Sequence, residues 1–151
     1  MARQFLGLCI FVGAALIIGT GHARAQSAAI KERQAVFDTF GDAVKEPGEM
    51  LRQEAAFDLK VVQASLKAIR EGAPKLKALF PDDSKTGGNT EALAVIWTRK
   101  DQVLMLFDKL ATDAAAAAAA IKDEATFKAE WGKVSSNCRG CHKVYRALPK
   151  K

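Results

Sequence analysis

The chain has 151 residues, of which 23 are Lys or Arg and 17 are Asp or Glu, for a formal net charge of +6, and 49% are hydrophobic. A chain of this length can bury one core, and a weak positive charge is a matter of solubility and steering rather than a sign of nucleic-acid binding. We therefore expect a single domain and no nucleic-acid partner.

The first 25 residues have the pattern of a secretory signal peptide. Arg3 supplies a short positive start, an uncharged apolar run follows from Phe5 to Gly21, and Ala23-Arg24-Ala25 gives an Ala-x-Ala cleavage site. The competing interpretation is a membrane anchor, but the run is slightly short for a span and ends in small residues. We predict that residues 1–25 are cleaved and that residues 26–151 form one domain, exported to the periplasm without a membrane anchor.

The remaining chain shows helical periodicity and no sustained alternation of apolar and polar residues. Pro47 either ends the first helix or kinks it, with residues 49–52 continuing the helix beyond the kink. Asp58 is a plausible N-cap of the second helix, and residues 81–89 are expected to form a loop. The expected helices cover about residues 28–45, 58–72, 90–120 and 124–148. Four helices joined in this way predict an all-α fold, an antiparallel four-helix bundle.

The sequence Cys138-Arg139-Gly140-Cys141-His142 carries most of the functional information. Two thiols and an imidazole at this spacing are typical of covalent c-type haem attachment. On a helix, residues three and four apart share a face, so both thiols can reach the vinyl groups of one porphyrin while His142 reaches the iron. The alternatives are a redox Cys-x-x-Cys pair and half of a zinc site. The first would need a βαβ pattern and the second further Cys or His ligands, and neither is present.

Signal cleavage would limit what can hold the iron. Cys9 and His22 would be lost, which leaves His142 as the only imidazole and excludes a bis-His haem within one chain. Met50, Met105 and lysines are then the ordinary candidates for a sixth ligand. Only nine residues follow His142 and none is Met, so the chain cannot use the plan of small cytochromes with an N-terminal motif and a downstream Met ligand.

A Cys-x-x-Cys-His on the last helix of a four-helix bundle resembles the cytochrome c′ family, the class II c-type cytochromes. The resemblance covers Ala28 to Arg146 and implies one covalent haem c, an antiparallel bundle and commonly a homodimer through the first two helices. The chain departs from the family at Ser135-Ser136-Asn137, where Gly is frequent. The other matching segments are Arg33-Gln34, Phe57-Asp58, Leu79-Phe80-Pro81, Ile96-Trp97 and Tyr145-Arg146.

The resemblance also implies roles for residues around the haem. The residue four after the first-helix Arg faces the distal side of the iron, and here it is Phe37. Relatives with Met at this position resemble low-spin electron carriers, whereas an apolar residue leaves the sixth position open but crowded. Phe37 has no lone pair to donate, which favours five-coordinate iron.

Three further residues are candidates for the haem pocket. Arg33 and Gln34 lie about one turn before Phe37, and Arg suits carboxylate pairing, so we expect them near a haem propionate; the alternative for Arg33 is a solvated surface side chain. Arg146 follows His142 by four residues and would share its face on a continuous helix. Its alternative is an exposed tail residue.

These features lead to three hypotheses of different classes. The first is a periplasmic haem protein that binds small gases, NO and CO, because an apolar distal wall lacks the donor that stabilises bound O₂. The second is a low-spin electron carrier of the same fold, similar to cytochrome c-556, with a periplasmic redox partner. The third is a peroxidase-like enzyme, but no second His or carboxylate is evidently placed to handle protons on the distal side. We favour the first hypothesis and expect no enzymatic activity.

Overall fold

The computed structural model describes residues 20–148, with side chains from Ala28 onward. Most of the expected signal peptide, residues 1–19, lies outside the described residues. The four long helices are α1 (Thr20–Leu51), α2 (Leu59–Gly72), α4 (Lys100–Ala120) and α5 (Glu124–Tyr145). Shorter helical segments lie between α2 and α4: η1 (Ala73–Ala78), η2 (Asp82–Ser84) and α3 (Val95–Thr98).

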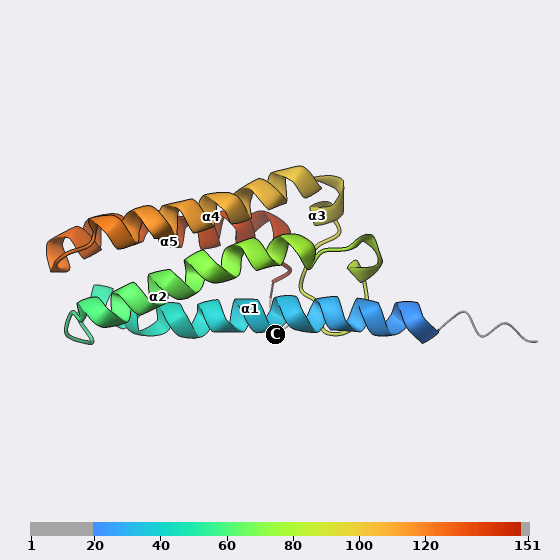
Figure 1. The fold of residues 1–151 in the computed structure, drawn as a ribbon, viewed down its shortest axis with the longest axis horizontal. Coiled ribbons are helices and arrows are strands. Elements are labelled where there is room, and N and C mark those ends of the chain that lie inside the picture. The colour runs from blue at the N-terminus through green and yellow to red at the C-terminus, as the bar shows by residue number, and fades with distance from the viewer. Residues whose placement is uncertain (1–19, 149–151) are drawn as a thin grey trace, which may run out of the picture.

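The long helices form an antiparallel bundle in which each one runs opposite to the next along the chain (Figure 1). The closely packed pairs are α1 with α2, α2 with α4, and α4 with α5, whereas α1 and α5 do not pack closely against each other. Because α5 carries the Cys-x-x-Cys-His motif and packs closely on α4 alone among the long helices, we expect the predicted site on the side of α5 that faces α1. The predicted four-helix bundle is confirmed.

The core is built from the apolar face of each helix. Phe127 and Trp131 of α5 pack their rings 5.6 Å apart, and Phe80 stacks on Phe107 at 5.7 Å. Asp58 is the N-cap of α2 as predicted, because its carboxylate accepts hydrogen bonds from the backbone N–H groups of Lys60 and Val61.

At the C-terminal end of the first helix, the structure shows the continuation beyond Pro47 rather than a stop before it. Pro47 does not end α1, which continues to Leu51. Pro47 is itself buried, and Met50, one turn further on, is only 3% exposed. Packing of this last turn on the core offsets the hydrogen bond that the proline cannot donate.

Two predicted boundaries at the other end of the bundle are wrong for a common reason. Residues 90–94 are not helical, and α5 ends at Tyr145 rather than at residue 148. The two segments pair with each other instead: Leu93 N–H donates to the Tyr145 carbonyl at 3.0 Å and Ala147 N–H to the Glu91 carbonyl at 2.8 Å. Tertiary backbone pairing satisfies these groups in place of a helix.

No helix among residues 20–148 combines the length and apolar character needed to cross a membrane.

Candidate functional site: the Cys-x-x-Cys-His turn

The two motif thiols lie on the inner side of α5. Cys138 and Cys141 are half-buried and not joined in a disulfide. Burial raises the pKa of both thiols, and the charge of Cys138 adds to the effect at Cys141. A reactive redox cysteine has a lowered pKa, so this environment does not match a thioredoxin-like pair. Two shielded thiols one helical turn apart fit thioether attachment to one porphyrin.

His142 lies one turn after Cys138 on the same helix, and its side chain is exposed. Desolvation lowers its pKa, the charge of Arg146 lowers it further, and Glu91 opposes them. A lowered pKa keeps the imidazole neutral at neutral pH, so a ring nitrogen lone pair is available to a metal.

Arg146 reaches the neighbourhood of His142 by a different route from the one expected. The helix has already ended, and Arg146 has extended backbone angles as the C-cap residue. The argument from a continuous helix is therefore wrong. Its side chain donates from Nε to Glu91 Oε2 at 2.6 Å, and its backbone pairs with Ala92. The ion pair holds the guanidinium close enough for its charge to act on His142.

Arg33 is not a solvated surface residue, because it is only 2% exposed. Its guanidinium donates from Nη1 to the Leu79 carbonyl and Ser84 Oγ, and from Nη2 to the Ser84 carbonyl and Thr90 Oγ1, at 2.7–3.2 Å. It also lies over the rings of Phe80 and Trp97, 4.9 and 5.7 Å from their centroids. All of these acceptors are neutral, and burial lowers the pKa of the group.

A buried cation without a carboxylate partner is unusual, because buried charges are normally paired. Among the described residues, no Asp or Glu forms an ion pair with Arg33. The four hydrogen bonds all come from the two terminal nitrogens and go to uncharged acceptors. A haem propionate would supply the missing negative charge, so the side chain fits the role that the sequence predicted for it.

Gln34 and Phe37 occupy the same helix beside Arg33. Gln34 donates to the Asn89 carbonyl at 3.0 Å and helps to line a cavity of about 220 Å³ with Ile30, Lys31 and Gly88. Phe37 is half-buried and packs edge-on against Phe40, with ring centroids 6.1 Å apart. The polar side chain thus faces the loop while the aromatic one packs toward the core.

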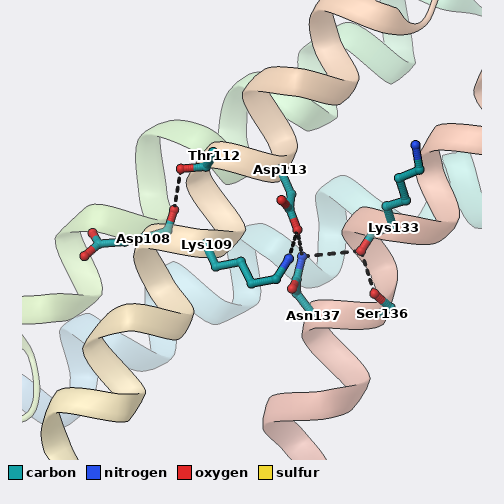
Figure 2. Close-up of polar contacts among 7 residues, drawn as sticks. All are labelled: Asp108, Lys109, Thr112, Asp113, Lys133, Ser136 and Asn137. Atoms are coloured by element: carbon teal, nitrogen blue, oxygen red, sulfur yellow. Dashed lines mark hydrogen bonds and ion pairs between the residues drawn. The ribbon is translucent and has the colours of Figure 1, made fainter.

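One polar contact beside the motif was not foreseen. Asn137, immediately before Cys138, donates from Nδ2 to Asp113 Oδ2 of α4 at 2.7 Å, and Lys109 pairs with the same carboxylate (Figure 2). The only signal in the sequence was the Ser-Ser-Asn departure from the family pattern. It did not indicate a partner 24 residues away.

The described residues contain no group of three or more His, Cys, Asp and Glu side chains that could hold a metal ion. The half zinc site considered from the sequence therefore gains no further ligands in this part of the chain. His142 as an axial ligand, with two thiols to anchor a porphyrin, remains the donor set that the residues fit.

Comparison with known proteins agrees with this site. A bundle with a Cys-x-x-Cys-His turn on its last helix defines a class II c-type cytochrome, and the family model described as Cytochrome C' matches residues 28–146. The chain belongs to the cytochrome c′ family, and members of this family carry covalently bound haem c.

Individual relatives cover most of the chain. Cytochrome c′ of Rhodopseudomonas palustris is 49% identical over 132 residues, which is 87% of this chain and 90% of that protein. Its solved structure superimposes with a TM-score of 0.79 over 81% of this chain and 98% of the other. Cytochrome c-556 of Agrobacterium tumefaciens is 33% identical over 117 residues, 76% of this chain and 90% of the relative. The predicted family and its haem c cofactor are confirmed.

Proposed function

We propose that this protein is a periplasmic haem c protein whose iron is five-coordinate, with His142 as its only protein ligand, and that it binds small gases such as NO and CO. Bound haem supplies the iron at which a diatomic gas is held. The chain's own residues decide whether the sixth position is open, and the placement of its two internal methionines is the observation that carries the proposal.

Neither methionine is placed to become a sixth ligand. Met50 is buried at the far end of the bundle, where it lines a cavity of about 440 Å³ together with Glu124, the first residue of α5. His142 lies 18 residues further along α5, or about 27 Å at 1.5 Å per residue. Met105 is 69% exposed on α4. Both positions support an iron without a thioether ligand.

Phe37 supports the same conclusion from α1. Its ring has no lone pair and, as a half-buried group next to Phe40, it offers bulk without a hydrogen-bond donor. An apolar distal wall disfavours O₂, which depends on a donor, more than NO or CO. We therefore propose Phe37 as the distal wall, with Arg33 and Gln34 at the propionate edge and Arg146 on the proximal side.

The test combines the spectrum with the rate of CO binding. The ferrous protein should be high-spin and should shift on adding CO. Phe37→Ala should raise the CO association rate at least tenfold, whereas Phe37→Met should convert the iron to low spin. Phe57→Ala is the matched control, because it removes another half-buried ring at the opposite end of the bundle. A CO rate that is equal in wild type, Phe37→Ala and Phe57→Ala would exclude Phe37 as the distal gate.

The second candidate is a low-spin electron carrier with a periplasmic redox partner. The 33% identical cytochrome c-556 favours it, because that relative covers most of the same chain. A sharp low-spin spectrum of the ferrous wild type, unchanged by CO, would support this function over gas binding.

Three other features remain predictions. Export after cleavage at residue 25 can be checked by N-terminal sequencing of the mature protein. Homodimerisation can be checked by analytical ultracentrifugation. The expected lack of enzymatic activity can be checked by a peroxidase assay of the purified protein.

A further inference from the structure

The stretch of α5 that leads into the haem motif is made of weak helix formers. Gly132, Ser135, Ser136 and Asn137 all favour the helix less than Ala does. Three of these side chains bond back to carbonyls of the preceding turn. Ser135 Oγ donates to Gly132 O at 3.2 Å, Ser136 Oγ to Lys133 O at 2.7 Å, and Asn137 Nδ2 to Lys133 O at 3.3 Å. Such bonds compete with regular helix geometry. The local sequence therefore does little to hold this turn.

Tertiary contacts hold it instead: Val134 is buried in the core, and a polar link adds to this packing. Asn137 Nδ2 donates to Asp113 Oδ2 at 2.7 Å and so links α5 to α4 one residue before Cys138. Figure 2 shows the amide of Asn137 and the ammonium of Lys109 both reaching the same oxygen of the Asp113 carboxylate. These two donors lower the pKa of Asp113, so the carboxylate stays ionised and bonds more strongly than a neutral acceptor.

The α4 side of this contact is firmly seated. Leu110, Ala114 and Ala117 are buried in the core on the same helix. Asp113 lies between them in sequence and is half-buried. A carboxylate on a packed helix can fix the position of an amide in a turn made of weak helix formers.

We propose that Asp113 and Asn137 are positioning residues that hold the haem-attachment turn of α5 in place. The inference rests on the proposed haem site. It adds to that site two residues that determine the position of His142. Neither residue touches the iron. They act through the backbone of the turn that carries Cys138, Cys141 and His142.

The matched control is a second polar link made by the same helix. Asp108 of α4 pairs with Lys77 of η1, with both carboxylate oxygens within 2.9 Å of Nζ. Asp108→Ala therefore removes the same charge and a similar tertiary link, five residues away, without touching α5. Asn137→Ala adds a separate check, since Ala is the better helix former and strengthens the local helix while removing the link.

The experiment uses the holoproteins of Asp113→Ala, Asn137→Ala and Asp108→Ala. Amide hydrogen exchange over residues 133–142, the reduction potential and the CO association rate are measured for each. Both variants of the link should speed exchange in this segment at least tenfold and change the CO rate at least threefold, with a shifted potential. Asp108→Ala should leave all three near wild type. The double variant Asp113→Asn with Asn137→Asp restores a charged hydrogen bond with the two partners exchanged. Its hydrogen exchange, CO rate and reduction potential should return most of the way to the wild-type values.

The outcomes separate this inference from the proposed function. If Asp113→Ala and Asn137→Ala match Asp108→Ala in exchange and potential, the positioning role is excluded. If wild-type protein does not respond to CO, gas binding fails, but exchange and potential still test the link. Should Asp113→Ala not fold, Asn137→Ala and the exchanged pair decide the question, and an exchanged pair no better than Asn137→Ala contradicts it.

Discussion

Replacing Arg33 by Leu should cost the protein a large part of its stability. Arg33 makes four hydrogen bonds from a side chain that is 2% exposed. Hydrogen bonds of charged groups contribute about 1.5–3 kcal/mol each, so the gross loss is about 6–12 kcal/mol. Removing the desolvation cost of a buried guanidinium returns several kcal/mol. We expect the free energy of unfolding to fall by about 3 kcal/mol.

A second substitution separates charge from geometry at the same position. Arg33→Lys keeps the positive charge but replaces a planar fork with a single ammonium, which cannot reach all four acceptors. It should lose most of the stability that Arg33→Leu loses. The reduction potential should fall only in Arg33→Leu, because a cation near a propionate favours the reduced haem and Lys keeps that cation.

The assay is guanidinium unfolding of the holoproteins followed by helicity, together with a redox titration. Gln34→Leu is the control, since this half-buried neighbour makes one side-chain hydrogen bond, to the Asn89 carbonyl. An unfolding free energy of Arg33→Leu equal to that of Gln34→Leu would refute the reasoning about the buried hydrogen bonds. A potential shared by all the variants would refute the propionate assignment alone.

Three further predictions concern α5. His142→Ala should keep haem covalently attached but lose the native ferrous spectrum. Denaturing electrophoresis checks the attachment, and absorption spectroscopy of the native protein checks the spectrum. Cys138→Ala combined with Cys141→Ala should abolish covalent attachment and leave a poorly folded chain, visible as reduced helicity, because the bundle loses the apolar group at its centre. Asp123→Asn should destabilise the protein at neutral pH, because the capping box with Thr126 lowers the pKa of Asp123. A carboxyl group with a lowered folded-state pKa stabilises above its unfolded pKa and loses this contribution as pH falls through the folded value. The difference from wild type in unfolding free energy should therefore shrink below about pH 4.

Local signals in the sequence were sufficient for the bundle, the N-cap at Asp58 and the haem motif. Helical periodicity and the Cys-x-x-Cys-His spacing depend on residues within a few positions of each other. Contacts between distant segments were not available from such patterns. The pairing of residues 91–93 with 145–147 decided where α5 ends, and apolar packing of Met50 carried α1 past Pro47.

In the candidate pocket, too, local patterns could be predicted from the sequence and contacts between distant segments could not. A guanidinium at position 33 could be expected near a propionate from the resemblance, but its burial against the faces of Phe80 and Trp97 is a product of the fold. The link between Asp113 and Asn137 joins residues on two helices, so no spacing rule predicts it. Resemblance to a family suggests a role for a residue. Only the folded structure shows which other groups that residue also contacts.

The segment between η1 and α3 connects α1 with the C-terminal end of α5. Arg33 of α1 donates hydrogen bonds to Leu79, Ser84 and Thr90, along most of this segment. At its C-terminal end, residues 91–93 pair with residues 145–147, just beyond α5. Because α1 and α5 do not pack closely on each other, the segment is a direct link between the helix of Phe37 and the helix of His142. If Phe37 and His142 lie on opposite faces of the haem as proposed, the space above the iron depends on hydrogen bonds made outside the pocket, and the buried Arg33 connects the loop to the helix of Phe37.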